Sequence, residues 1–173
     1  MKRQLFIGCM LLAGCTTFND GLYRPVSGRE KKAFARADQA ISPADVRRGF
    51  DSFRTREVAW AGIIKDIRFK ETERTIQVAF QVEHRHFDWL THTGRAGYRL
   101  SAAGDGEFMV GWSVRKPTSV GRLMAQAKPG YMLVAYGKPY RIMDGVVQLE
   151  ATAVRPVSTR KFTIQPAEGK PLE

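Results

Sequence analysis

The sequence has few cysteines, few acidic residues and no hydrophobic run long enough to cross a membrane as a helix. Its 173 residues include two cysteines, which excludes a disulfide-rich scaffold and a zinc site built from four thiolates. The apolar run at residues 5–13 is much shorter than the roughly 20 residues that a transmembrane helix needs. Acidic residues number 17 against 28 lysines and arginines, so we expect partners that carry negative charge.

The first fifteen residues have the pattern of a bacterial lipoprotein signal. Two basic residues precede the short apolar run, and the motif LAGC follows it and ends at Cys15. A charged start, a short apolar segment and small residues are typical of a secretory signal. The ending resembles a lipobox, whose cysteine is acylated and then holds the chain to a membrane. We predict a signal peptide at residues 1–14 and lipid attachment at Cys15; the alternative is a buried N-terminal element with an incidental cysteine.

Lipid attachment would also restrict chemistry and location. Cys9 would leave with the signal and Cys15 would carry lipid, which excludes disulfide, redox and cysteine-nucleophile chemistry in the mature chain. An Asp directly after the acylated cysteine is the usual inner-membrane retention signal in enteric-type bacteria, and here Thr16 follows Cys15. We therefore predict a lipid-anchored protein of the outer membrane.

The mature chain divides into a tether, a basic helical segment, a β domain and a tail. We place these at residues 15–28, 29–56, 57–157 and 158–173. In the helical segment, Ser42 and Pro43 predict a helix start that leads to an end near Gly49. The basic residues of this segment could attract an anionic membrane surface or form a solvated face that only aids solubility, and the sequence does not separate these two interpretations.

From Glu57 onward the sequence is typical of β-structure. Residues 75–87 alternate apolar and polar side chains, as expected for a half-buried strand. We expect five strands, the third of them bent, at residues 58–69, 75–87, 98–100 with 107–112, 131–137 and 146–157. A short helix is expected at residues 119–127, between the third and fourth strands. This order predicts a mainly β, five-stranded OB-like barrel preceded by an N-terminal helical segment; an open β-sandwich is the alternative.

Residues 58–64, which read VAWAGII, carry a family resemblance. Together with the Ser-Pro helix start and the lipobox ahead of them, they resemble the starvation-lipoprotein (Slp) family of outer-membrane lipoproteins. In that family a valine, a tryptophan and a glycine occupy the first strand of the domain. Ala61 departs from the family pattern, in which a second glycine is usual, and residues 83–89 have no counterpart there. The resemblance implies an outer-membrane location and this fold, and no particular activity.

All three histidines, His84, His86 and His92, fall within nine residues. In a strand, His84, His86 and Asp88 would share a face, and imidazoles at this spacing can bind zinc or copper. A metal-dependent hydrolase that uses the three histidines is therefore one alternative function. The other interpretation is a hydrogen-bonded loop where the strand leaves the core, and we expect no metal and no other cofactor.

Enzymatic activity has little support elsewhere. The serines lack the Gly-x-Ser-x-Gly context of a nucleophile elbow, and the glycine-rich turn at residues 103–106 lacks the Lys-Ser/Thr and helix start of a phosphate loop. We therefore predict that the protein is not an enzyme.

Ligand binding fits the composition better than enzymatic activity does. OB barrels bind ligands on the face of their second and third strands and on two adjacent loops. Aromatic rings among cations suit sugar rings or bases that carry phosphates. The predicted binding face consists of Arg85, Trp89, Arg95, Tyr98, Arg99, Trp112, Arg115, Tyr140 and Arg141. The alternative is that these aromatic residues fill the core and the arginines are solvated.

The sequence thus predicts a lipid-anchored envelope protein that acts as a binding or assembly module. Its partners would be the membrane, through the N-terminal lipid, and an anionic envelope ligand or an envelope protein. A periplasmic binder of glycan, lipopolysaccharide or single-stranded nucleic acid is an alternative, in which nucleic acid is disfavoured because the signal exports the chain.

Overall fold

The computed structural model describes residues 23–89 and 97–166. The predictions for the signal peptide and Cys15 lie outside these residues, as do those for His92 and Arg95.

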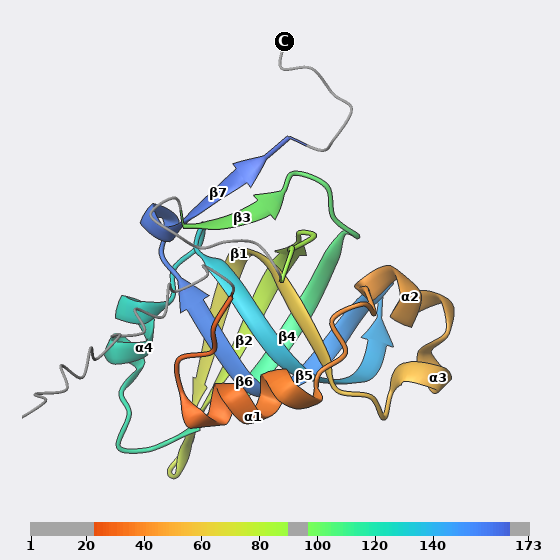
Figure 1. The fold of residues 1–173 in the computed structure, drawn as a ribbon. Helices are drawn as coiled ribbons and strands as arrows, with labels where there is room; N and C mark the ends of the chain where they lie inside the picture. Colours follow the sequence, from red (N-terminus) through yellow and green to blue (C-terminus); the bar gives the residue numbers. More distant parts are fainter. Residues whose placement is uncertain (1–22, 90–96, 167–173) are drawn as a thin grey trace, which may run out of the picture.

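Five strands close into a barrel in the order β1-β2-β4-β6-β5, with β5 pairing back onto β1 (Figure 1). The strands are β1 (Val58–Glu71), β2 (Thr75–His84), β4 (Glu107–Arg115), β5 (Met132–Met143) and β6 (Val146–Val157). Neighbouring strands are antiparallel, except that β4 and β6 run parallel. α4 (Val120–Gln126) lies between the third and fourth barrel strands. The predicted OB-like barrel, with its single helix at this position, is confirmed.

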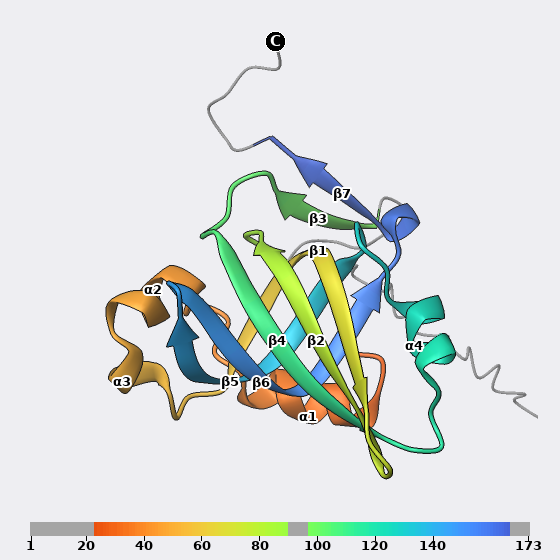
Figure 2. The same cartoon turned by 180° about the vertical axis from the view of Figure 1, so that it is seen from behind.

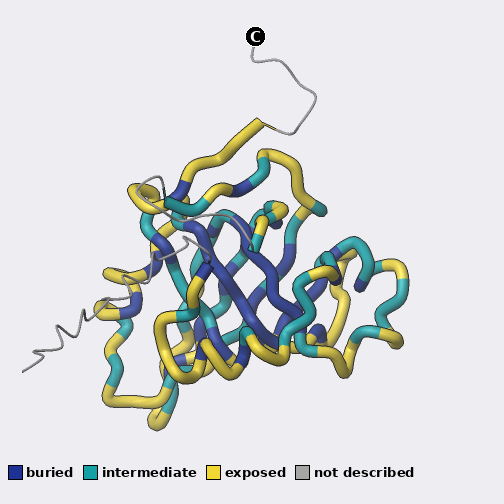
Figure 3. Tube along the Cα trace, in the orientation of Figure 1, coloured by how far each residue is buried: buried dark blue, intermediate teal, exposed yellow. Residues whose placement is uncertain are grey.

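The barrel forms because its strands carry one apolar face. In β2 the alternation predicted from the sequence is observed, with Ile76, Val78, Phe80 and Val82 buried. These side chains pack inside the barrel against Trp60, Phe108 and other inward-facing residues, and Figure 3 shows the buried positions concentrated along the strands. Removing this apolar surface from water is the main stabilising contribution expected for such a core.

Among the described residues, three helices precede the barrel: α1 (Gly28–Arg36), α2 (Pro43–Arg48) and α3 (Phe50–Phe53). The predicted start of α2 is confirmed, because the Ser42 hydroxyl accepts a hydrogen bond from the backbone N–H of Asp45 and the Asp45 carboxylate accepts one from that of Ser42. The indole N–H of Trp60 donates to the carbonyl oxygen of Ile41 over 2.7 Å, which fixes the segment before α2 against the barrel. None of the described helices is long and apolar enough to cross a membrane.

The third strand differs from the prediction. β3 (Tyr98–Ser101) does not continue into β4; it pairs in parallel with β7 (Phe162–Gln165) in a separate two-stranded sheet (Figure 1). The turn at residues 102–106 separates β3 from the barrel. β7 and the short helix η1 (Thr159–Lys161) also lie in the predicted flexible tail, where burial of Phe162 gives this segment an apolar contact that holds it in place.

A second cluster of buried apolar residues lies outside the interior of the barrel. Tyr23, with 3% of its surface exposed, is at its centre. Its ring contacts those of Phe34, Phe87, Trp89 and Tyr98. The folded part therefore includes Tyr23, which the sequence assigned to the tether at residues 15–28.

Candidate functional site

The outer face of β2 and β4 carries a hollow. Figure 2 shows these two strands with no helix in front of them. The hollow has a volume of about 770 Å³. It is lined by Arg29, Arg68, Phe69, Lys70, Gln77, Val78, Ala79, Gly111, Trp112, Ser113, Tyr140, Glu150 and Ala151.

Strand register explains the shape of this hollow. Arg68 pairs with Ala79, and Ala79 pairs with Gly111, so these three positions face the same side of the sheet. One step along, Lys70 pairs with Gln77 and Gln77 with Ser113. Small residues on the central strands β2 and β4 thus form a floor, and the long cationic side chains of β1 stand at its edge.

Positive charge dominates the hollow. Arg29 of α1 joins Arg68 and Lys70, against the single carboxylate of Glu150. Nε of Arg68 is 3.0 Å from a carboxylate oxygen of Asp66, whereas the side chains of Arg29 and Lys70 have no ion-pair or hydrogen-bond partner among residues 23–89 and 97–166. A second hollow of about 490 Å³ shares Arg29 and Glu150 with the first and adds Lys32 and Arg36 of α1 and a second carboxylate, Glu57. We call the two adjoining hollows the cationic groove.

Aromatic rings form part of the same groove. Tyr140 is 46% exposed, yet its hydroxyl donates to the side-chain oxygen of Gln148 over 2.7 Å. The guanidinium of Arg141 lies 5.4 Å from the centre of the Tyr140 ring and donates to the same Gln148 oxygen. The ring is therefore held in place while one surface remains open to a ligand. Trp112 is half-buried, and its indole N–H has no hydrogen-bond partner among the described residues.

The structure does not bring the nine predicted face residues together. Trp112 and Tyr140 line the groove, Arg141 packs on Tyr140, and Arg115 lies two residues beyond Ser113 on β4. The other described members lie elsewhere, because β3 is outside the barrel and residues 85–89 have left it: Arg85, Trp89, Tyr98 and Arg99.

The sequence prediction missed the five cations of the groove, Arg29, Lys32, Arg36, Arg68 and Lys70. The spacing of Arg68 and Lys70, two apart in a strand, is the signal that could have found these two, because it places both on one outward face. No local signal places Arg29 there, since α1 reaches the groove only through the tertiary fold.

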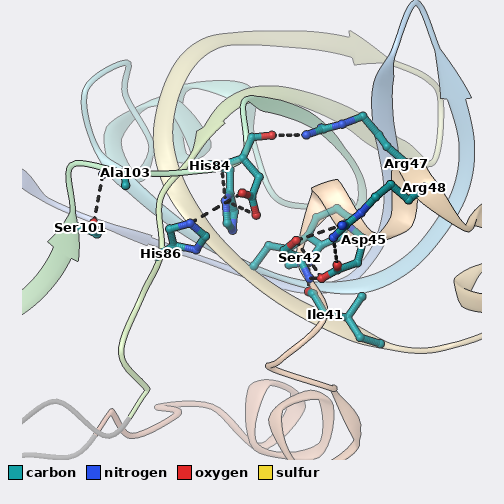
Figure 4. A network of polar contacts seen from close by, with 11 residues as sticks. Ile41, Ser42, Asp45, Arg47, Arg48, His84, His86, Ser101 and Ala103 are labelled. Carbon is teal, nitrogen blue, oxygen red and sulfur yellow. Dashed lines mark hydrogen bonds and ion pairs between the residues drawn. The ribbon is translucent and has the colours of Figure 1, made fainter. Parts of the chain in front are cut away.

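The histidine cluster lies at the opposite end of β2. His84 ends the strand, and the rings of His84 and His86 meet edge to face with centres 5.2 Å apart. The third member is Asp105, whose carboxylate oxygens lie 3.6 Å from Nδ1 of His84 and 3.7 Å from Nε2 of His86. Figure 4 shows His86 beside His84, with Arg47 reaching toward them from α2. Arg47 donates to the backbone carbonyl of Asp105.

Burial controls the charge of His84. Its removal from water lowers its pKa to about 4, with smaller contributions in the same direction from His86, Arg47 and Arg85, and the Asp105 carboxylate opposes the shift. His84 is therefore neutral at neutral pH, and its Nδ1 accepts a hydrogen bond from the backbone N–H of Asp105 over 3.0 Å. His86, in contrast, is half exposed at its side chain, with 52% of its surface accessible.

The structure therefore changes the predicted set of metal ligands. Among the described residues, the cluster able to hold a metal is formed by His84, His86 and Asp105, and it does not include Asp88. Asp105 was missed because it comes 21 residues after His84, on a turn that the sequence identified only as a turn.

Comparison with known proteins adds no assignment. No family model matches the chain, and no curated protein matches it.

Proposed function

We propose that this chain is a lipid-anchored protein of the bacterial outer membrane that binds an anionic saccharide in the cationic groove and performs no catalysis. The lipobox ending at Cys15 and the threonine after it support the anchor and the location. The likeness of residues 58–64 to the starvation-lipoprotein family agrees with both.

The observation that carries the binding proposal is a pair of cations, Arg29 and Lys70, whose side chains have no carboxylate partner in the described part of the chain and which lie beside a small-residue floor and an open aromatic ring. Phosphate or carboxylate groups form charge-assisted hydrogen bonds with such cations. A sugar ring can lie on the Tyr140 ring, which presents a flat apolar surface. A phosphorylated or acidic sugar supplies both features, and an exported protein meets such sugars in the envelope.

The groove's composition supports binding without catalysis. Among the described residues, its lining has five cations against two carboxylates, Glu57 and Glu150, and contains no histidine or cysteine. Glycoside cleavage generally uses two carboxyl groups on either side of the scissile bond, whereas the first hollow, which holds Lys70 and Tyr140, has Glu150 as the one carboxylate among its described lining residues.

The test is calorimetric titration with the lipid-free, phosphorylated core oligosaccharide of lipopolysaccharide. We expect binding that weakens about tenfold in Arg29→Ala and again in Lys70→Ala, since a hydrogen bond to a charged group contributes about 1.5–3 kcal/mol. Lys31→Ala is the matched control, because Lys31 belongs to the same helix as Arg29 but does not line the groove.

Two outcomes would overturn the binding proposal. One is equal affinity of the wild type and the Arg29→Ala, Lys70→Ala double variant. The other is tighter binding of a 15-nucleotide oligothymidylate than of the oligosaccharide, with a steep dependence on salt, which would indicate a nucleic-acid binder.

The anchor is tested separately by labelling cells with a fatty acid and fractionating their membranes. We expect label and outer-membrane location in the wild type and loss of both in Cys15→Ser. A wild-type protein that is unlabelled and found in the cytoplasm would contradict the anchor.

A further inference from the structure

We propose that His84, His86 and Asp105 form a binding site for one divalent transition-metal ion, separate from the cationic groove. The site lies where β2 ends and where the turn at residues 102–106 packs against it. It is independent of the proposed saccharide binding, because none of its three residues lines the groove.

The backbone fixes the two segments that carry the ligands. His84 N–H donates to the carbonyl oxygen of Gly106 over 2.7 Å, and His86 N–H donates to that of Ala103 over 3.1 Å. Gly104 allows this approach, because a Cβ at that position would overlap the carbonyl group of His84. The turn is thus held against the end of β2 from both sides, which keeps the carboxylate of Asp105 beside the two imidazoles.

The donor atoms have nearly the spacing of a metal site. One nitrogen of each histidine and a carboxylate oxygen of Asp105 all lie within 4.8 Å of one another. Metal–ligand bonds of about 2.0–2.1 Å in tetrahedral geometry separate neighbouring ligand atoms by about 3.3 Å. The distances of 3.6 Å from His84 Nδ1 to Oδ2 of Asp105 and of 3.7 Å from His86 Nε2 to Oδ1 are within a few tenths of an ångström of this value, and any separation that reaches the limit of 4.8 Å must close by about 1.5 Å.

The carboxylate of Asp105 also has an oxygen atom without a hydrogen-bond partner among the described residues, and a cation could bind there. Its Oδ2 atom is buried and accepts no hydrogen bond within the described part of the chain. A buried carboxylate oxygen without a partner costs free energy. A metal ion at this position would coordinate that oxygen.

Two features oppose metal binding and limit the choice of ion. The backbone N–H of Asp105 donates to Nδ1 of His84, so coordination through Nδ1 must replace this hydrogen bond and shift the turn slightly. The guanidinium of Arg47 is close by, whereas that of Arg85 is compensated by Glu83 at 2.7 Å. Two imidazoles and one carboxylate favour zinc, copper or nickel over magnesium or calcium.

The site has no room for an extended substrate on the side toward Trp60. The cavity next to His84 and His86 has a volume of about 100 Å³. We therefore assign metal binding to this cluster and no hydrolytic step.

The experiment is a zinc titration of the purified full chain by calorimetry, with Cys9 and Cys15 replaced by serine so that no thiol competes and with no affinity tag. We expect one ion per chain, with an affinity at least tenfold lower in His86→Ala and in Asp105→Asn. His92→Ala is the matched control and should bind like the parent. Circular dichroism checks that each variant is folded, which we expect because the side chain of His86 is half exposed.

A spectroscopic measurement identifies the ligands directly. On addition of zinc, the ¹⁵N resonances of His84 Nδ1 and His86 Nε2 should shift, and those of His92 should not. The proposal is overturned if the parent binds no stoichiometric ion, if affinity is unchanged in folded His86→Ala and Asp105→Asn, or if His92→Ala alone removes binding.

Discussion

At the scale of single residues, a buried chain of hydroxyls connects α1 to the barrel. Tyr136 on β5 donates its hydroxyl proton to the Tyr23 hydroxyl over 2.8 Å, and Tyr23 in turn donates to the Glu30 carboxylate. Burial raises the pKa of both phenols above the ordinary range, and the Glu30 carboxylate raises the pKa of Tyr23 further. Both hydroxyls thus remain protonated donors at every pH at which the fold is stable.

This order of donors predicts unequal effects of two similar substitutions. Tyr136→Phe removes only the end of the chain and should lower the free energy of unfolding by about 1 kcal/mol. Tyr23→Phe leaves both the Tyr136 hydroxyl and a Glu30 oxygen with one partner fewer, and should cost about 2–3 kcal/mol. Urea denaturation at pH 7 measures both values. Equal costs, or a larger cost for Tyr136→Phe, would contradict the order of donors.

The burial of His84 predicts a dependence of stability on pH. Its folded-state pKa of about 4 lies below the unfolded value of about 6.5, so between these values the unfolded chain binds a proton that the folded chain does not. The metal-free protein should therefore lose up to about 3 kcal/mol of stability as pH falls from 6.5 to 4. Urea denaturation in this pH range, with a chelator present, measures the loss.

Two variants assign that loss to one imidazole. His84→Gln should reduce the dependence between pH 6.5 and 4, whereas His86→Gln, at an exposed side chain, should retain most of it. If both variants kept the full dependence, another group would be responsible.

Some residues of the two sites could be predicted from the sequence and others could not. Arg68 and Lys70 could be placed on one face from their spacing, and the pairing of His84 with His86 was predicted. The contributions of Arg29 and Asp105 could not be, because α1 and the turn at residues 102–106 reach their sites only through contacts distant in sequence.

At the scale of elements, two glycines with different surroundings predict substitutions of opposite sign. A Cβ on Gly62 of β1 would overlap the carbonyl oxygen of Glu83 on β2, so Gly62→Ala should destabilise by about 1–3 kcal/mol. Gly121 in α4 has nothing within 4 Å of such a Cβ, so Gly121→Ala should stabilise by about 0.5–1 kcal/mol. Thermal unfolding of both variants checks the signs, and a stable Gly62→Ala protein would mean that β1 and β2 can separate locally.

The elements also show what determined the success of the strand predictions. β2 and β6 were predicted well because their apolar residues follow the periodicity that burial against the core requires. β3 and β7 are four residues each and gain their stability from pairing with each other across about 60 residues of sequence. Such pairing leaves no periodic signal in either segment, so β3 was joined to β4 and β7 was assigned to a tail.

At the scale of the whole molecule, the barrel closes without the β3–β7 sheet. A chain ending at Ser158 should keep the barrel but lose Phe162, which is buried in the cluster around Tyr23. We expect retained far-ultraviolet circular dichroism and a loss of about 3–5 kcal/mol, comparable to that of truncating a buried phenylalanine.

A shorter truncation provides the matched control for this prediction. A chain ending at Pro166 keeps β7 and should be as stable as the full chain. Complete loss of structure in the chain ending at Ser158 would show that the barrel depends on the β3–β7 sheet.

The burial of Tyr23 limits how far the folded part of the chain can lie from Cys15. Seven residues separate it from Cys15, and even fully extended they span about 28 Å. A chain acylated at Cys15 would hold its groove within a thin layer above the lipid. Saccharides attached to the same membrane would then be present at a high effective concentration near the groove. They would occupy the groove even if their intrinsic affinity for it were low. A free sugar of identical structure would gain nothing from the anchor and would bind only at its intrinsic affinity.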